Sequence, residues 1–307
     1  MRVPPVNAWL SPADVGRRVT VRRQTVTGLR DTVGNLVAWT AGPTGTLQVE
    51  GRDGVIVDLK TTEITAARVV PPEISALRLQ VITEAAWPVS DHEALGDWML
   101  RFAGGEARRT NSARITGVPS GDVHHALDYI TEWYERRGIR AQVQTPAPGA
   151  FDQVLMDKGW EPFSESYFMV RDSAEGGAVA ENVHVASSPS NDWLTVAAPD
   201  MARGLAAPMA LAQHQRFITV YDGETPVSVG RVVGHEGWGI VTTVRTAADE
   251  QRKGYGRTCM DAVHSAARDM GAKAFMLQVL LENEKAVPLY NGLGYYTHHH
   301  YRYFLAP

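Results

Sequence analysis

Short alternations of apolar and polar residues run through the first 70 positions of the chain. Segments that contain glycine separate these runs, as expected for strands joined by tight turns. The runs lie at residues 19–23, 33–39, 47–50 and 55–59. Four or five strands at a spacing of about ten residues predict a small all-β barrel over residues 1–70, with its end marked by Pro71-Pro72.

The following hundred residues, 73–171, mix the periodicities of helices and strands. Within residues 123–138, apolar side chains recur at every third or fourth position, a helical spacing that Gly138 ends. The same reasoning predicts helices at residues 74–86 and 151–158, and strands at residues 98–102, 141–144 and 163–170.

Residues 172–178 are small, polar and rich in glycine, which is typical of a linker. Beyond them, strands alternate with helices over residues 182–307, and a hairpin turns at Asp222-Gly223. Strands are predicted at residues 183–186, 216–221, 225–233, 238–245, 274–280 and 295–304, and helices at residues 192–196, 258–270 and 288–292. The predicted fold class is α/β (α+β), with a mixed central sheet flanked by helices and preceded by the small barrel.

The composition excludes several classes of protein. The chain has 307 residues, 44% of them apolar and 21% charged, with a formal net charge of −4, so nucleic acid and acidic lipid are not expected partners. A single cysteine, Cys259, precludes an intrachain disulfide. No apolar run reaches the ~18 residues of a membrane span, and the N-terminus lacks the apolar core of a signal peptide, so a cytoplasmic protein is expected.

The stretch from Gln251 to Arg257 carries the clearest chemistry in the sequence. It follows a β-branched apolar run, opens a helical pattern, and contains two glycines and three basic residues. Glycines let backbone N–H groups approach a phosphate, and a helix N-terminus adds roughly half a positive charge. This order of strand, basic turn and helix predicts a phosphorylated ligand held by backbone rather than by a metal.

Two common phosphate-binding loops do not fit this stretch. A P-loop requires G-x-x-x-x-G-K-[ST], whereas Gly254 and Gly256 are two positions apart and no Lys-Ser or Lys-Thr follows them. A dinucleotide-binding fingerprint requires a third glycine where Cys259 stands. Such a fingerprint also lies near the start of its domain, whereas this stretch lies near the end of the sequence.

The stretch does resemble the signature [RQ]-x-x-G-x-[GA] of the GNAT superfamily, the N-acyltransferases that use acetyl-CoA. Gln251, Gly254 and Gly256 fill its fixed positions, and Val244 and Thr246 stand at the apolar positions of the strand before it.

The resemblance continues downstream, so that it covers roughly residues 182–304. Residues 283–290 match the pattern N-x-x-A-x-x-x-Y, and a terminal glycine-aromatic pair follows. The matching residues are Asn283, Ala286 and Tyr290, then Gly294 and Tyr295. The loop by itself is a moderately specific motif, and the three motifs in order are far more specific.

The resemblance implies acetyl-CoA as co-substrate, without a metal, and indicates where it binds. The pyrophosphate is expected at the loop, where basic side chains add to the backbone donors. The pantetheine arm is expected to pair with the strand before the loop, and Asn283 to hydrogen-bond that arm or to cap its helix. The implied binding residues are Val244, Arg245, Thr246, Gln251, Arg252, Lys253, Gly254, Tyr255, Gly256, Arg257, Thr258, Asn283 and Ala286.

By the same resemblance, Tyr290 is the expected catalytic residue, a proton donor to the departing thiolate. Many GNAT enzymes carry a glutamate base in an L-E-V pattern, but here Gln278 takes that position and cannot accept a proton. The base is left open among Glu282, Glu236, His235 and a chain of water molecules.

Two further features suggest chemistry but favour structural interpretations. His298, His299 and His300 are consecutive, and consecutive side chains of a strand alternate between its faces, so the three cannot readily share one metal ion. Cys259 follows the loop on the predicted helix and is expected to be a small packing residue.

The two earlier segments also resemble known modules. Residues 73–171 contain the order helix, Gly-Trp, strand, which is similar to the order helix, Gly-Tyr, strand at the end of the chain. They therefore resemble a GNAT-like domain, but a degenerate one. Their main helix is preceded by Pro119-Ser120-Gly121-Asp122 and not by a [RQ]-x-x-G-x-[GA] loop. Residues 1–70 resemble an SH3-like barrel, in which Arg17, Arg18, Arg22 and Arg23 could form a basic patch for a protein partner. The predicted domains are therefore 1–70, 73–171 and a catalytic GNAT domain over 182–307.

The expected function is N-acetyl transfer from acetyl-CoA to a primary amine by direct attack in a ternary complex. An acetyl-CoA sensor without turnover, and an adaptor centred on the barrel, are the alternatives. The acceptor, a small molecule or a peptide, would be selected by residues 191–213 and 295–303, which the sequence does not specify further. A homodimer is compatible with the sequence.

Overall fold

The computed structural model describes residues 10–26, 28–40, 44–51, 55–70, 74–172 and 179–307. By its internal contacts the chain forms two units, Met1–Ser75 and Ala76–Pro307. The expected boundary at Pro71-Pro72, most of the expected linker (173–178) and parts of two expected turns (41–43 and 52–54) lie outside the described residues.

The first unit contains a five-stranded antiparallel sheet in the order β4-β3-β2-β1-β5, which confirms the strands predicted there. Alternation places apolar side chains on one face, where Val19, Val21 and Leu36 are buried without exposure. The strands are β1 (Arg18–Thr25), β2 (Gly28–Trp39), β3 (Thr46–Glu50), β4 (Ile56–Lys60) and β5 (Ile64–Val69). Its assignment as an SH3-like barrel stays a prediction.

Two of the four arginines expected to form a basic patch on this unit are paired with carboxylates. Arg22 donates two hydrogen bonds of 2.8 Å to Asp31, and Arg17 donates one of 2.8 Å to Asp14. The patch is therefore less positive than the sequence suggests.

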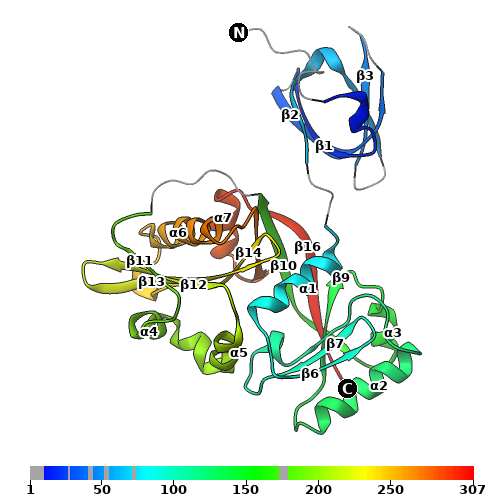
Figure 1. Cartoon of the computed structure of the whole chain (residues 1–307). Coiled ribbons are helices and arrows are strands. Elements are labelled where there is room, and N and C mark those ends of the chain that lie inside the picture. The colour runs from blue at the N-terminus through cyan, green and yellow to red at the C-terminus, as the bar shows by residue number, and fades with distance from the viewer. Residues whose placement is uncertain (1–9, 27, 41–43, 52–54, 71–73, 173–178) are drawn as a thin grey trace. The chain divides into compact units, whose positions relative to one another are not determined.

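The second unit contains one mixed sheet of eleven strands, in the order β11-β12-β13-β14-β15-β10-β16-β9-β8-β7-β6 (Figure 1). Its strands are β6 (Asp91–Leu95), β7 (Trp98–Phe102), β8 (Ala113–Arg114), β9 (Gln142–Ala147), β10 (Glu161–Asp172), β11 (Val183–Ala186), β12 (Gln215–Asp222), β13 (Thr225–His235), β14 (Trp238–Thr246), β15 (Ala274–Leu280) and β16 (Tyr296–Leu305). Its α-helices are α1 (Ala76–Thr83), α2 (Val123–Glu135), α3 (Asp152–Asp157), α4 (Asn191–Asp200), α5 (Ala206–Leu211), α6 (Tyr255–Asp269) and α7 (Ala286–Gly292).

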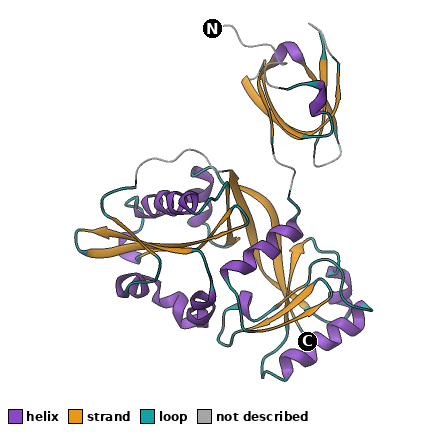
Figure 2. Ribbon diagram, viewed as in Figure 1, coloured by secondary structure: helices purple, strands orange, loops and turns teal. Residues whose placement is uncertain are grey.

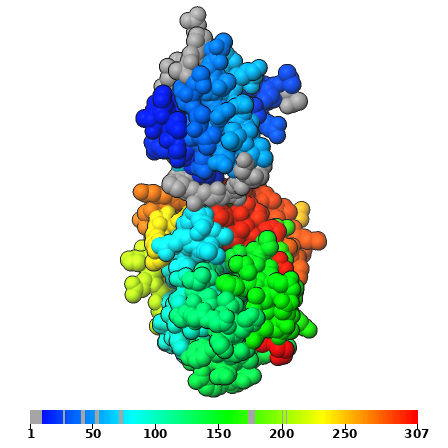
Figure 3. Space-filling view, turned by 90° about the vertical axis from the view of Figure 1, so that its right-hand side faces the viewer, coloured from blue at the N-terminus to red at the C-terminus, as the bar shows by residue number. Residues whose placement is uncertain are grey.

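The two halves of this sheet exchange their last strands. Strand β10, which ends the first half of the unit, lies between β15 and β16 of the second half and pairs with both. Strand β16, at the end of the chain, pairs in turn with β9 of the first half. Figure 3 shows the consequence on the surface, where residues of the first half in green lie directly beside C-terminal residues in red. The halves share one continuous sheet, and their description as separate domains, 73–171 and 182–307, stays a prediction.

Helices cover both faces of the second half, as Figure 2 shows. Helices α6 and α7 lie on one face of β11–β14, and α4 and α5 lie on the other (Figure 1). Helix α6 approaches the sheet closely, since a Cβ on Gly230 would come within 2.9 Å of the Cys259 sulfur. Cys259 is fully buried there, which agrees with the expected packing role.

Each helix and strand predicted for residues 74–307 has a counterpart in the structure. The predictions missed β6, β8, α5 and the turn of helix before it, η6 (Met201–Leu205). Strand β6 has only two apolar residues among five, and β8 has two residues in all, so neither has a recognisable pattern. No helix in the described part of the chain is both long enough and apolar enough to cross a membrane.

Candidate functional site

The predicted loop leads directly into the N-terminus of α6. Gly254 adopts a left-handed conformation with φ of 94°, which is costly for other residues, and Arg252 has φ of 69°. Among the described residues, no acceptor is within hydrogen-bonding distance of the backbone N–H groups of residues 252–256, whereas the Arg257 N–H donates to the Gly254 carbonyl at 2.9 Å. Five consecutive donors at a helix N-terminus form a site suited to an anion.

The side chains of the loop are more occupied than its backbone. The Lys253 ammonium contacts the Glu250 carboxylate at 2.9 Å, and the Arg257 guanidinium donates to the Gly292 carbonyl at 3.3 Å. The Tyr255 hydroxyl hydrogen-bonds Asp222, which raises the pKa of that hydroxyl. Among the described residues, the backbone amides of residues 252–256 and the exposed Arg252 guanidinium are therefore donors of this loop that have no partner.

Strands β14 and β15 separate just before the loop. They pair in parallel only at Trp238, Gly239 and Ile240, and from Val241 onward none of the described strands pairs with β14 on this side. A bulge accompanies the separation, with Thr243 at φ of 51°, an unusual value for a β-branched residue. The result is a V-shaped opening inside the sheet.

Backbone groups of β14 face this opening at alternate residues. The Ala247 N–H donates to the Val227 carbonyl of β13 at 2.9 Å. In an antiparallel ladder the next residue turns its N–H and C=O away from that partner, so those of Thr246 face the opening. Arg245, one residue earlier, faces β13 again. Of the residues predicted for the pantetheine arm, Thr246 thus turns its backbone groups toward the opening and Arg245 does not.

Helix α7 brings the downstream motif to the same place. The Asn283 side-chain oxygen accepts the Ala286 N–H at 3.2 Å, which is the capping arrangement considered from the sequence. A Cβ on Gly256 would lie 3.5 Å from the side chains of both Leu289 and Thr246. The starts of α6 and α7 and the end of β14 therefore converge.

Tyr290, the predicted proton donor, lies in the core of the second half. Its side chain is 7% exposed and packs in the same cluster as Cys259 on α6. Burial raises the pKa of the Tyr290 hydroxyl well above its ordinary value, so this group stays protonated at physiological pH. Burial also raises the pKa of the Cys259 thiol, to about 12, which makes it a poor nucleophile.

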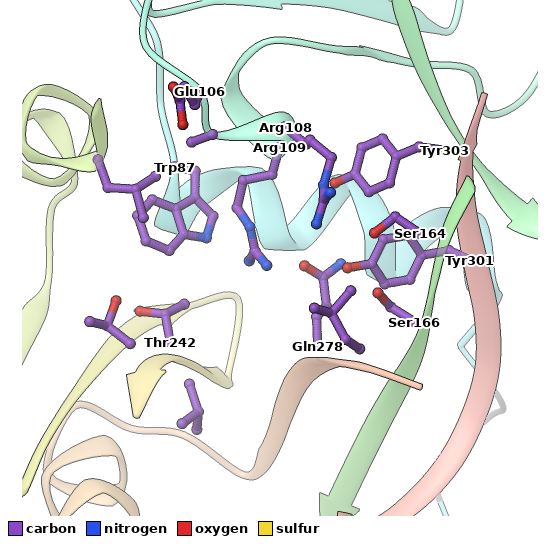
Figure 4. A pocket seen from close by; sticks show the side chains of 15 residues that line it. Trp87, Glu106, Arg108, Arg109, Ser164, Ser166, Thr242, Gln278, Tyr301 and Tyr303 are labelled. Carbon is purple, nitrogen blue, oxygen red and sulfur yellow. The ribbon is translucent and has the colours of Figure 1, made fainter. Parts of the chain in front are cut away.

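A cavity of about 410 Å³ occupies the opening between β14 and β15 and extends toward the first half. Figure 4 shows the guanidinium groups of Arg108 and Arg109 pointing into it, beside Trp87, Gln278 and Tyr303. The lining residues are Trp87, Glu106, Ala107, Arg108, Arg109, Ser164, Ser166, Leu205, Val241, Thr242, Thr243, Gln278, Leu280, Tyr301 and Tyr303.

The first half contributes much of this lining, which the sequence did not reveal. Arg108 and Arg109 come from the turn η5 (Arg108–Thr110), and Ser164 from a bulge of β10, where its φ is 50°. The expected acceptor segments contribute Leu205 and the tyrosines of β16. The adjacent arginines after Gly104-Gly105 were the only hint in the sequence, because strand exchange cannot be read from local periodicity.

The residues considered as general base lie elsewhere. Glu236 pairs with Arg78 at 2.5 Å and lies 3.5 Å from the His235 imidazole, and neither it, His235 nor Glu282 lines the cavity. Among the lining residues, Glu106 alone carries a carboxylate, and it is exposed. In Figure 4 it lies beyond the indole of Trp87, away from the centre of the cavity.

The three consecutive histidines have separate environments. His300 contacts the Glu165 carboxylate at 2.9 Å, and His299 stacks on Phe168 with ring centroids 4.5 Å apart. His298 and His299 contact each other through their Nδ1 atoms at 2.9 Å. Within the described residues, no group of three or more metal-ligating side chains is arranged around a common point.

Comparison with known proteins matches this architecture to one family. The model of the family described as "Probable histone acetyltransferase Rv0428c C-terminal" matches residues 75–304. The chain is 28% identical to the probable histone acetyltransferase Rv0428c of Mycobacterium tuberculosis, over 95% of each chain. It is 24% identical to the uncharacterized N-acetyltransferase YobR of Bacillus subtilis, over 73% of this chain and 97% of the relative.

Solved structures show the same fold. A GCN5-related N-acetyltransferase from Kribbella flavida superposes with a TM-score of 0.61 and 16% identity, over 76% of this chain and 95% of that one. A tandem GNAT protein from the clavulanic acid biosynthesis pathway superposes with a TM-score of 0.51 and 11% identity, over 78% and 89%.

Proposed function

The chain belongs to the Rv0428c C-terminal family of GNAT acetyltransferases, and we propose that it transfers the acetyl group of acetyl-CoA to a primary amine by direct attack in a ternary complex. The observation that carries this proposal is the row of five free backbone donors at residues 252–256 beside the opening between β14 and β15. A pyrophosphate suits the donors, and an amide-containing arm suits the unpaired strand edge.

The residues of the second half fit coenzyme A in two further respects. Gly254 presents no side chain toward the donors, and a Cβ added there would meet no atom of the described residues within 4 Å, so a phosphate can approach its backbone. Thr246 offers an N–H and a C=O to the arm, and Asn283 retains its side-chain NH₂ for a further hydrogen bond while its oxygen caps α7. When bound, the thioester supplies the activated acetyl group.

Tyr290 is the proposed proton donor to the thiolate that leaves. Its hydroxyl is held neutral by burial, so it can donate a proton over the whole physiological pH range. Because the carboxylate of Glu106 is at the edge of the cavity, we propose that the incoming ammonium loses its proton to water rather than to a side chain. The rate should then rise with pH as the fraction of free amine rises.

Replacement of Tyr290 by phenylalanine tests this role. The variant keeps the packing of the ring, so its thermal stability and acetyl-CoA affinity should stay near those of the wild type. Turnover, measured as thiol release from acetyl-CoA, should fall by about 100-fold, the usual contribution of a positioned acid. Unchanged turnover with a functional amine would remove Tyr290 from the mechanism.

A sensor that binds acetyl-CoA without turnover is the second candidate, favoured by the depth at which Tyr290 is buried and by Gln278 in place of a carboxylate. Thiol release across a panel of amines separates the two functions. Turnover above the hydrolysis background with any amine excludes a pure sensor, and saturable acetyl-CoA binding without turnover across the panel would support it.

A further inference from the structure

The cavity is lined by cations that the described part of the chain does not neutralise. Among the described residues, neither Arg108 nor Arg109 has a hydrogen bond or an ion pair through its guanidinium. Each lies over aromatic rings instead: the Arg109 Cζ is 5.3 Å from the Trp87 centroid, and the Arg108 Cζ is 5.8 Å from that of Tyr303. Stacking fixes the positions of these groups while their N–H donors stay available.

Two other donors at the cavity also lack an acceptor. The indole Nε1 of Trp87 and the side-chain Nε2 of Gln278 are buried, and neither has a hydrogen-bond partner in the described structure. Both residues line the cavity. An unsatisfied buried donor is costly, and such donors are usually satisfied by a ligand or by water.

A third arginine lies behind the wall. Arg231 is fully buried, with its Cζ 4.9 Å from the Trp87 centroid, and its Nη1 donates to the Ala86 carbonyl at 3.0 Å. Its Nε donates to the Gln215 side-chain oxygen at 2.8 Å, and neither a partner for its Nη2 nor a carboxylate in contact with its guanidinium is found among the described residues. Burial, and secondarily the charge of Arg109, lower its pKa to about 9.

The other buried arginines of this unit differ from Arg231 because they are paired with a carboxylate. Arg101 and Arg114 are also buried, but both donate to the carboxylate of Glu84, at 3.2 and 2.8 Å. Buried arginines are expected to be paired in this way, because an uncompensated buried charge is strongly destabilising. Around the cavity, by contrast, three guanidinium groups converge on Trp87 and Tyr303 without a counter-ion from any described residue.

We propose that the acceptor is a small amine that also carries an oxyanion, a carboxylate or a phosphate, which Arg108 and Arg109 bind. The proposal rests on the proposed function, and it defines the substrate class of that site. Trp87 Nε1 and Gln278 Nε2 add neutral donors, and Arg231 adds a positive field from behind the wall. A cavity of about 410 Å³ admits a small molecule or the end of a peptide, and its positive lining disfavours a lysine-rich tail.

A matched set of amines tests this specificity with the full chain. The set consists of an ω-aminoalkanoate, its carboxamide, the corresponding aminoalkyl phosphate, the unsubstituted aminoalkane and a lysine-rich peptide. The kcat/KM from thiol release should favour the carboxylate or the phosphate over the carboxamide by about 10- to 100-fold, as expected for hydrogen bonds to a charged group. The two anionic members identify which oxyanion is preferred.

Variants then assign the preference to the arginines. In Arg109→Gln and Arg108→Gln the ratio of anionic to carboxamide kcat/KM should fall about tenfold or more, while the KM for acetyl-CoA changes little. Arg140→Gln removes an exposed arginine outside the cavity and should leave the ratio as in the wild type. A wild-type preference for the carboxamide or the lysine-rich peptide, or an anionic preference that survives both substitutions together, would overturn the proposal.

Calorimetry separates this proposal from the proposed function. The ω-aminoalkanoate and the aminoalkyl phosphate are titrated into the protein saturated with coenzyme A, for the wild type and Arg109→Gln. If binding of the anionic amines depends on Arg109 but no amine gives thiol release, the anion site is supported and the transferase function is refuted. If amines are acetylated but the anionic ones are not preferred, the transferase function is supported and the anion site is refuted. Absence of both binding and turnover refutes both.

Discussion

The two halves of the large sheet each place a helix after a glycine-containing turn, but the N-termini of these helices are arranged in opposite ways. In the first half, the Asp122 carboxylate accepts the N–H groups of His124 and His125 at 2.9 and 3.2 Å. In the second half, Gly254 occupies the capping position and supplies no side chain, so the amides of α6 stay free. One helix terminus is closed by its own carboxylate, and the other is open to an external anion.

This difference separates the roles that we propose for the two halves, coenzyme binding for the second and acceptor binding for the first. A carboxylate cap both occupies the donors and repels a phosphate, so the N-terminus of α2 is unsuited to the pyrophosphate that we propose for α6. The first half contributes Trp87, Arg108 and Arg109 to the lining of the cavity and β10 to the sheet. We therefore propose that it lacks a coenzyme site but forms part of the acceptor site.

The largest effect is expected from separating the halves. Residues 182–307 expressed alone lack β10, which pairs along seven positions with β15 and along eight with β16, so two strand edges inside the sheet become unpaired. This fragment should be insoluble or unfolded, because exposed strand edges promote aggregation. Residues 76–307 are the matched control and should show a cooperative thermal transition. A soluble fragment 182–307 with such a transition would show that the halves are independent.

Closing the open helix terminus should give the next largest effect. Gly254→Asp places a carboxylate at the capping position, and Gly254→Asn places its neutral isostere there; both side chains tolerate a positive φ. The dissociation constant for acetyl-CoA, measured by calorimetry, should be about tenfold or more higher for the aspartate than for the asparagine variant, because the added charge repels the pyrophosphate. Equal affinities of the two variants would count against an anion at this terminus.

Opening the closed terminus should have the smallest effect. Asp122→Ala removes the cap of α2 and should lower the thermal midpoint slightly without changing acetyl-CoA affinity. Hydrogen bonds from the N–H groups of His125 and His124 lower the pKa of Asp122 below its ordinary 3.8. The ionised Asp122 carboxylate therefore stabilises the folded state fully at pH values above its ordinary pKa. This stabilisation is lost as the pH falls through the lowered pKa of the folded state.

The difference in midpoint between wild type and Asp122→Ala, followed by circular dichroism, should therefore be constant from pH 7 to about 5 and shrink below about pH 4. Asp122→Asn serves as the control, since it retains an acceptor but not the charge. A difference that grows toward low pH, or a loss of acetyl-CoA affinity in Asp122→Ala, would show that the first half has a role in binding the coenzyme.

Local pattern was enough to predict most of the elements, and it led to the proposed coenzyme site. Helical spacing, strand runs and glycine-marked turns are set by neighbouring residues, and so is the helix N-terminus at Gly254, which has no side-chain cap. The approach of Thr246, Gly256 and Leu289 is a finding of the structure that the order of the motifs did not specify.

The acceptor side depended on contacts between residues far apart in the chain. Trp87, Arg109, Ser164 and Tyr301 share no local pattern, and they meet only because β10 inserts between β15 and β16. The sequence by itself thus determined which half carries the proposed coenzyme site, through backbone conformation at Gly254 and the absence of a side-chain cap. Only the tertiary structure decided where the proposed acceptor site lies, because long-range strand pairing brings the arginines of one half to the open strand edge of the other.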